Sequence, residues 1–175
     1  MTPTRYTPAQ ITLHWLSALL VLLIIALPYG SDLFEPLLGG GAGVFTLHKS
    51  LGLLVMLLTL LRLVVRARSG APELLASEPP LQRFAAKGGH ALLYLLLLLM
   101  PLTGLLFGKR PVNLFWLVEI GPLPLSDAIR GAAKTFHVTA QYLLFALILG
   151  HAGMALWHHH VRRDNVLRSM LPARD

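Results

Sequence analysis

The sequence predicts an all-α fold: an integral membrane four-helix bundle that forms a single domain over residues 1–175. Hydrophobic residues make up 55% of the chain and charged residues only 13%, which is not the balance of an ordinary soluble domain. Four apolar blocks are each near the roughly 20 residues that a helix needs to cross a bilayer. We expect the four helices at about 9–29, 47–66, 88–107 and 135–159.

The first apolar block follows a short N-terminus that contains Arg5, as the core of a secretory signal peptide also would. The block is long for a signal core, and the stretch "ALPYGSD" at its end offers no small-x-small cleavage site. We therefore expect it to remain in the protein as the first membrane helix.

The basic residues predict the orientation of the bundle. Ten of the 15 Lys and Arg residues belong to the N-terminus, the second connection and the C-terminal tail: Arg5, Arg62, Arg66, Arg68, Arg83, Lys87, Arg162, Arg163, Arg168 and Arg174. Five belong to the other side: Lys49, Lys109, Arg110, Arg130 and Lys134. The positive-inside rule then puts both termini in the cytoplasm. This clustering beside apolar blocks indicates contact with membrane lipid and no nucleic-acid partner.

The connections between the apolar blocks offer fewer candidates for functional residues. The first, "GSDLFEPLLGGGAGVFT", is rich in glycine and reads as an outer loop or a short amphipathic turn. In the third, Pro and Gly interrupt the apolar residues too often for a fifth span. We expect it to form a cap at the outer interface, with Phe115 and Trp116 in the headgroup layer.

Histidines inside or at the ends of the apolar blocks are the main functional candidates, because ionisable side chains are costly in a membrane and usually face the bundle interior. His137 and His151 are 14 residues apart, about four helical turns, and so share one face at two depths. The topology puts His48 at the outer depth of His137 and His14 at the inner depth of His151. Two pairs follow: His48 with His137, and His14 with His151.

Two imidazoles that face each other from neighbouring helices are suitable axial ligands for haem iron, and the macrocycle fills the apolar gap between the helices. The four histidines therefore predict two b-type haems in the core, which would conduct electrons across the membrane. The chain has no cysteine, so covalent attachment through a C-x-x-C-H motif is excluded. His90 is an alternative to His14 as the partner of His151, and we prefer His14 because it lies deeper in its apolar block.

His158 is a candidate for a quinone site. It lies seven residues after His151, on nearly the same face and about 10.5 Å nearer the cytoplasm, where a quinone headgroup can approach the inner haem. A histidine there can exchange protons with a quinone that takes up electrons, although a border histidine is commonly just solvated. We assign no role to His159 and His160, because they directly follow His158 and three consecutive residues cannot lie on one face of a helix.

Lys49 and Lys134 flank the outer pair, next to His48 and three residues before His137. They are candidates to hold haem propionates or to attract an anionic substrate toward the outer haem. Ordinary surface lysines are the alternative.

Four segments carry a family resemblance over nearly the whole chain: "QITLHWL", "LHKSLGLLV", "GGHALLYLLLLLMPLTGLL" and "KTFHVTAQYLLFALILGHAGMALWHHHVRRDNVLRSMLP". On these segments the sequence resembles the bacterial cytochrome b561 family of small four-helix, two-haem membrane proteins. The resemblance implies the ligand pairs given above and electron exchange with ubiquinone in the bacterial inner membrane. Without a fused domain, the chain is similar to the stand-alone type, superoxide oxidases that reduce ubiquinone, in which Lys134 and Lys49 would draw in superoxide.

Two other functions stay open on the sequence. The chain could be the cytochrome b subunit that passes electrons between a dehydrogenase partner and quinone, which co-purification would reveal. It could also be a transporter whose histidines relay protons or bind metal, because such residues mark ion pathways too. The spans contain no carboxylate, which argues against a transporter, and a two-haem protein would be red.

Overall fold

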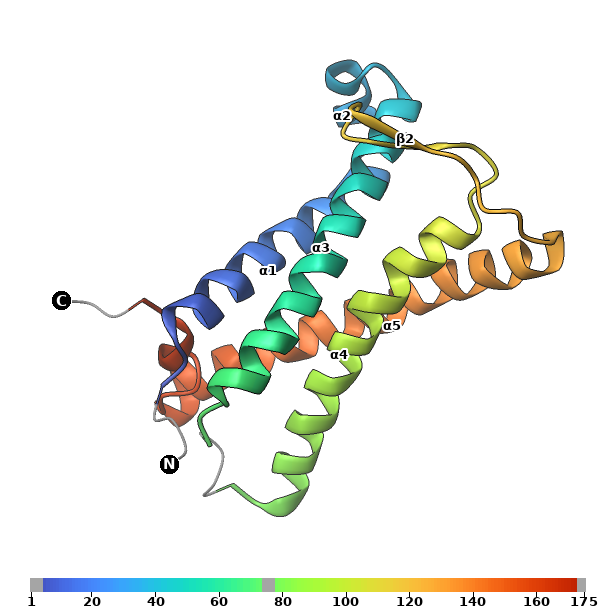
Figure 1. The fold of residues 1–175 in the computed structure, drawn as a ribbon. Coiled ribbons are helices and arrows are strands. Elements are labelled where there is room, and N and C mark those ends of the chain that lie inside the picture. The colour runs from blue at the N-terminus through green and yellow to red at the C-terminus, as the bar shows by residue number, and fades with distance from the viewer. Residues whose placement is uncertain (1–4, 74–77, 173–175) are drawn as a thin grey trace.

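The computed structural model describes residues 5–73 and 78–172 and confirms the all-α membrane bundle (Figure 1). In these residues, four helices are long and apolar enough to cross a membrane. They are α1 (Pro8–Tyr29), α3 (Gly41–Ser69), α4 (Pro80–Leu106) and α5 (Asp127–Trp157). α1 packs on α3 and α4 packs on α5, while contacts between α3 and α4 join the two pairs.

One end of the bundle, which we name the hairpin end, carries three short elements (Figure 1). They are the helix α2 (Ser31–Leu38) between α1 and α3, and the strands β1 (Val112–Leu114) and β2 (Val118–Ile120) between α4 and α5. The strands pair antiparallel, with Asn113 opposite Glu119. The hairpin is fixed to α3 by Ser50, whose buried hydroxyl accepts a hydrogen bond from the backbone N–H of Phe115 at 2.8 Å. The same hydroxyl donates to Thr46 O within α3.

At the other end, which we name the terminal end, α1 and α4 begin and α3 and α5 end. A π-helical turn (His158–Arg162) extends α5, and a 3-10 turn (Arg168–Met170) follows in the tail. Two long-range hydrogen bonds fasten this end: Gln10 Nε2 donates to Gly70 O at 2.8 Å, and Trp15 Nε1 donates to Met170 O at 2.6 Å. The start of α1 therefore holds both the end of α3 and the tail.

Local sequence signals explain where these helices begin. Thr7 caps α1 in a capping box with Gln10, ahead of Pro8 at the first helical position. Ser126 caps α5 by accepting a hydrogen bond from Ile129 N. Between α2 and α3 the chain turns sharply through Gly39 and Gly40, both at positive φ where a side chain would add strain.

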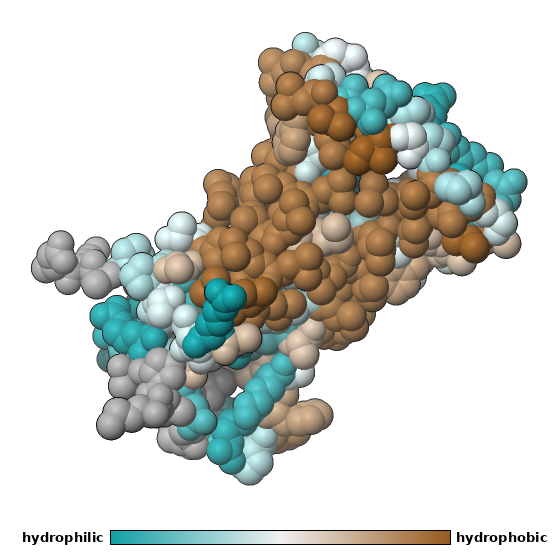
Figure 2. All heavy atoms as spheres, viewed as in Figure 1, coloured by the Kyte–Doolittle hydropathy of each residue, from teal (hydrophilic) through white to brown (hydrophobic). Residues whose placement is uncertain are grey.

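The surface has the pattern of a membrane protein (Figure 2). Hydrophobic residues cover the middle of the molecule, and hydrophilic residues gather toward its two ends. Large apolar side chains point outward from all four long helices, among them Leu19, Leu57, Leu95 and Leu149. In water so much exposed apolar surface would be unfavourable, whereas lipid tails accommodate it.

Three of the four long helices begin earlier in the chain than expected. α3, α4 and α5 begin at residues 41, 80 and 127 instead of about 47, 88 and 135, because backbone hydrogen bonding continues beyond the apolar block from which each start was predicted. The first connection, expected as a loop or a short turn, is largely the helix α2.

The third connection contains a β-hairpin that the sequence did not predict. Phe115 and Trp116 form its turn with φ of 49° and 59°, and Leu117 N donates to Leu114 O at 2.9 Å. This left-handed geometry normally favours Asn and Gly, so two bulky aromatic residues make it a costly turn. Their expected depth in the headgroup layer stays a prediction.

Candidate functional site

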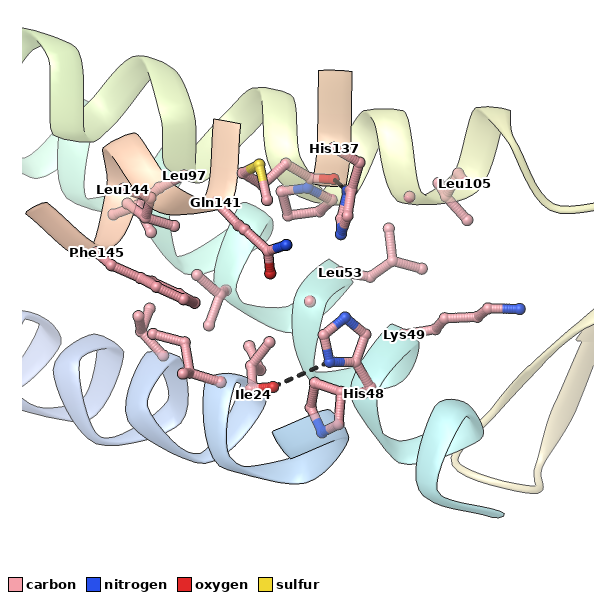
Figure 3. A pocket seen from close by; sticks show the side chains of 18 of the residues that line it. Ile24, His48, Lys49, Leu53, Leu97, Leu105, His137, Gln141, Leu144 and Phe145 are labelled. Atoms are coloured by element: carbon pink, nitrogen blue, oxygen red, sulfur yellow. Dashed lines mark hydrogen bonds between the residues drawn. The ribbon is translucent and has the colours of Figure 1, made fainter. Parts of the chain in front are cut away.

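At the hairpin end, α3 and α5 bring the rings of His48 and His137 close together in an edge-on arrangement. Their ring centres are 6.4 Å apart, with the ring planes at 69°. Figure 3 shows both rings projecting into the space between the helices. The pair that spacing and topology predicted is therefore brought together in the fold.

Backbone carbonyls of neighbouring helices determine which ring nitrogen of each of these two histidines carries the hydrogen. His48 Nδ1 lies 3.0 Å from Ile24 O of α1, and His137 Nδ1 lies 2.8 Å from Met100 O of α4. Because a carbonyl oxygen only accepts, each Nδ1 must carry the hydrogen, which leaves the Nε2 lone pair of a neutral ring free. Such an outer hydrogen bond is the usual support of a metal-binding histidine.

A cavity that is partly open to the outside adjoins the pair and takes its walls from all four long helices. Most of the walls are apolar, including Leu97, Leu144 and Phe145, and Figure 3 shows these side chains beside the two histidines. Such walls suit a large flat hydrophobic group.

Two features of α4 make room for the ring of His137. Pro101 has no backbone N–H and so interrupts the helix ladder. Gly104 has no side chain, and a Cβ placed there would lie 3.3 Å from His137 Cε1, closer than comfortable van der Waals contact. A loosening of this helix by Pro101 and Gly104, with close approach of a neighbour, was expected from the sequence.

The distances fit haem iron. A metal–nitrogen bond of about 2 Å on each side, plus about 1.2 Å from each nitrogen to its ring centre, places two axial imidazoles roughly 6.4 Å apart. The His48–His137 pair has this spacing without adjustment. In the described part of the chain, no group of three or more His, Asp or Glu side chains is arranged to hold a bare metal ion.

At the terminal end three histidines converge instead of two. The ring centre of His151 lies 6.0 Å from that of His14 and 5.3 Å from that of His90. The first distance is close to the axial spacing and the second is too short for it. His90 was expected at the helix border, but it lies against His151, with its Nδ1 2.7 Å from Ala86 O.

Arg62 of α3 adds a cation to this cluster. Its guanidinium lies 3.1 Å from His14 Nδ1 and 5.3 Å from the ring centre of Tyr94. A guanidinium only donates, so His14 accepts through Nδ1 and a neutral ring carries its hydrogen on Nε2. Ligation of iron through His14 Nε2 therefore requires Arg62 to release Nδ1. An arginine at the inner depth of an apolar block was a readable signal that the sequence reasoning did not use.

His158 begins the π-helical turn at the end of α5, seven residues after His151. Only 5% of it is exposed, and its Nδ1 lies 2.5 Å from Asp164 Oδ2 in the tail. Burial works against the charged form of Asp164, but the hydrogen bonds from His158 and Val166 N and the charges of His158 and Arg162 together lower the pKa of its carboxyl. The sequence predicted His158 as a site residue and missed this carboxylate.

The two lysines fall in different places. Lys49 is half-buried and lines the cavity, whereas Lys134 is exposed and is not among its walls. Two polar residues of the cavity were missed: Tyr29 donates to Gln141 Oε1 at 3.1 Å, which links α1 to α5 one turn beyond His137. Gln141 lies four residues after His137 inside an apolar block, and this spacing was the available signal.

Comparisons with known proteins point to one family. The family model described as prokaryotic cytochrome b561 matches residues 5–173. The chain is 34% identical over 175 residues to Cytochrome b561 homolog 2 of Escherichia coli, covering 97% of this chain and 93% of the relative. It is 32% identical over 178 residues to Cytochrome b561 homolog 1 of that bacterium, covering 97% and 98%. It is also 27% identical over 180 residues to the Probable superoxide oxidase CybB of Yersinia pestis, covering 96% of each.

Proposed function

The chain belongs to the prokaryotic cytochrome b561 family, and from this premise we propose that it carries electrons from superoxide to ubiquinone through two haems b. Membership of the family implies a multi-pass bacterial membrane protein that transfers electrons and binds b-type haem. The number of haems, their ligands and both substrates are our proposal. The name of the relative in Yersinia pestis supports superoxide as the donor.

In this proposal His48 and His137 hold the haem at the hairpin end, and His14 and His151 hold the haem at the terminal end. Bound haem supplies an iron centre that accepts and releases one electron at a time. The observation that carries the proposal is the hairpin-end pair, with axial spacing, two free Nε2 atoms and an apolar cavity beside it. For the terminal end we keep His14 over His90 because its 6.0 Å spacing is nearer to the axial value.

The charge distribution supports the direction of the proposed reaction. Among the described residues, nine basic residues lie toward the terminal end and five toward the hairpin end, which favours a cytoplasmic terminal end in the inner membrane. Superoxide would then be oxidised at the hairpin end, where Lys49 and Lys134 attract the anion. Ubiquinone would be reduced near His158 at the terminal end.

The overall reaction balances: two superoxide ions, one ubiquinone and two protons give two dioxygen molecules and one ubiquinol. The chain's own residues position the cofactors, exclude water from the core and supply protons at the quinone. Nothing else is consumed.

The proposal is tested with the purified protein in nanodiscs that contain ubiquinone. We expect a red protein with a reducible b-type spectrum and formation of ubiquinol on addition of superoxide, without a further protein. A colourless protein, even when expressed with ample haem precursor, would refute haem binding.

A second candidate function is that of a cytochrome b subunit that takes electrons from a dehydrogenase. The exposed apolar tip of the hairpin favours it, since Trp116, Leu117 and Val118 are all exposed at the hairpin end and a partner could cover them. In that case superoxide would not yield ubiquinol, and gentle extraction of native membranes would recover a dehydrogenase with the chain.

A further inference from the structure

The tail after α5 places a carboxylate on a buried histidine. The side chain of His158 is 6% exposed and that of Asp164 is 32% exposed, with 2.5 Å between Nδ1 and Oδ2. Asp164 therefore connects an almost fully buried imidazole with the surface of the terminal end. Since the carboxylate accepts at Nδ1, Nε2 is the nitrogen of His158 left for another partner.

Several local contacts hold Asp164 in this position. Arg163 takes a left-handed conformation with φ of 53°, which reverses the chain after the π-helical turn. The backbone N–H of Asp164 then donates to His158 O at 3.3 Å, and Val166 N donates to Asp164 Oδ1 at 3.0 Å. Farther along, Trp15 binds Met170 O. A π-helical turn inside an α-helix is often found at a functional site.

Two other charged side chains adjoin the pair. Arg162, four residues after His158, contributes to the lowered pKa of Asp164 and forms an ion pair with the buried carboxylate of Glu78 from the segment before α4. Glu78 is only 7% exposed and accepts a hydrogen bond from Arg162. The ion-pair partner of Arg162 is therefore Glu78, and the partner of Asp164 is His158. The two ion pairs thus have separate roles at the terminal end.

We propose that Asp164 and His158 form the proton-entry pair of the quinone site. Asp164 is the positioning residue: its carboxylate accepts from Nδ1 and so orients the ring of His158. His158 Nε2–H donates a proton to a quinone oxygen as the quinone gains electrons, while Nδ1 keeps its hydrogen on Asp164, and Nε2 takes the next proton from the cytoplasmic side. Each ubiquinone reduced takes two electrons and two protons, so the pair works twice in each cycle. This inference rests on ubiquinone reduction at the terminal end.

The test compares Asp164→Asn with wild type as the haem-loaded protein in detergent. The protein is first reduced with superoxide, and its re-oxidation by the soluble quinone ubiquinone-1 is then followed optically between pH 5.5 and 9. We expect unchanged haem content and unchanged reduction by superoxide, but re-oxidation about tenfold slower above neutral pH. The rate should fall because the amide oxygen of asparagine is a weaker acceptor for Nδ1–H than a carboxylate and orients the ring of His158 less firmly.

Three further variants separate proton entry from a structural role. Asp164→Glu keeps the charge and should restore the rate–pH profile. His158→Gln should slow re-oxidation at least as much, and adding Asp164→Asn to it should slow the reaction no further, since the two residues act as one unit. Asp127→Asn makes the same chemical change at the far end of α5, at an 84% exposed side chain paired with Lys109, and should match wild type.

Each outcome decides between the claims. If wild type transfers electrons to ubiquinone-1 and Asp164→Asn gives the same profile, the proton-entry role is wrong while the proposed function stands. The same conclusion follows if Asp164→Glu fails to restore the profile or if the double variant is slower than His158→Gln alone. If wild type does not react with ubiquinone-1 at all, the proposed function itself fails.

Discussion

The hairpin-end and terminal-end histidines differ in what fixes their rings. At the hairpin end, two carbonyls from neighbouring helices fix His48 and His137 beside an apolar cavity. At the terminal end, three rings converge, a guanidinium contacts one of them and two ion pairs lie close to the helix end. In the proposed function, the first site holds one cofactor only, whereas the second has enough polar groups to serve a cofactor, a quinone and its protons.

The largest expected effect concerns the hairpin-end site. His137→Ala removes a ligand whose place no other histidine near this site can take, so we expect about half of the bound haem to be lost. The haem-to-protein ratio measures this, with His160→Ala as the control. Full haem content in both His137→Ala and His48→Ala would show that this pair is not the ligand set.

The crowded site offers the next test, because two candidates compete for one position. His14→Ala should also lose about half of the haem, whereas His90→Ala should retain it and change only the spectrum or potential of the terminal-end haem. Ratios and redox titrations of the two variants are compared directly. Loss in His90→Ala with retention in His14→Ala would reverse the assignment.

The two ends of the Glu78–Arg162 ion pair should differ in their effect on stability. Arg162→Gln leaves a buried carboxylate without its cation, which we expect to lower the free energy of unfolding by about 3 kcal/mol. Glu78→Gln leaves a half-exposed cation and should cost about 1 kcal/mol. Thermal unfolding in one detergent gives both values, and equal losses would contradict the difference in burial.

A smaller effect is expected for the lysines at the hairpin end. Lys49→Gln should slow reduction by superoxide a few-fold at low salt, with a smaller difference at high salt, because attraction of an anion is screened. Lys134→Gln, on an exposed lysine outside the cavity, should have less effect. Stopped-flow measurements at two ionic strengths test this, and an unchanged Lys49→Gln rate at low salt would exclude steering by this lysine.

The smallest effect is a pH dependence of stability from Asp164. Its pKa is lower in the folded protein than its usual value, so its contribution is present above about pH 4 and is lost as pH falls through the folded pKa. Asp164→Asn should therefore flatten the acid side of a plot of melting temperature against pH. A curve parallel to that of wild type would contradict the cited pKa shift.

The histidine pairs could be predicted because each follows from helix topology and a 14-residue spacing. The approach of His90 to His151 could not be predicted in this way. The apolar block indicates a helix that begins near residue 88, whereas α4 begins at Pro80. His90 thus lies nearly three turns inside the helix, about 15 Å from its start. The contact of Asp164 with His158 depends on a π-helical turn and on the left-handed conformation of Arg163. Neither feature can be predicted from the periodicity of apolar residues.

Ser50 joins the hairpin to the helical turn that carries His48. Its hydroxyl accepts from Phe115 N of the hairpin and donates to Thr46 O within α3, and Ser50 lies two residues after His48, which is an iron ligand in the proposed function. A partner that displaces the aromatic tip of the hairpin is therefore expected to move the backbone of His48. In the proposed function this movement would alter the bond between the imidazole and the iron, and with it the redox potential of that haem.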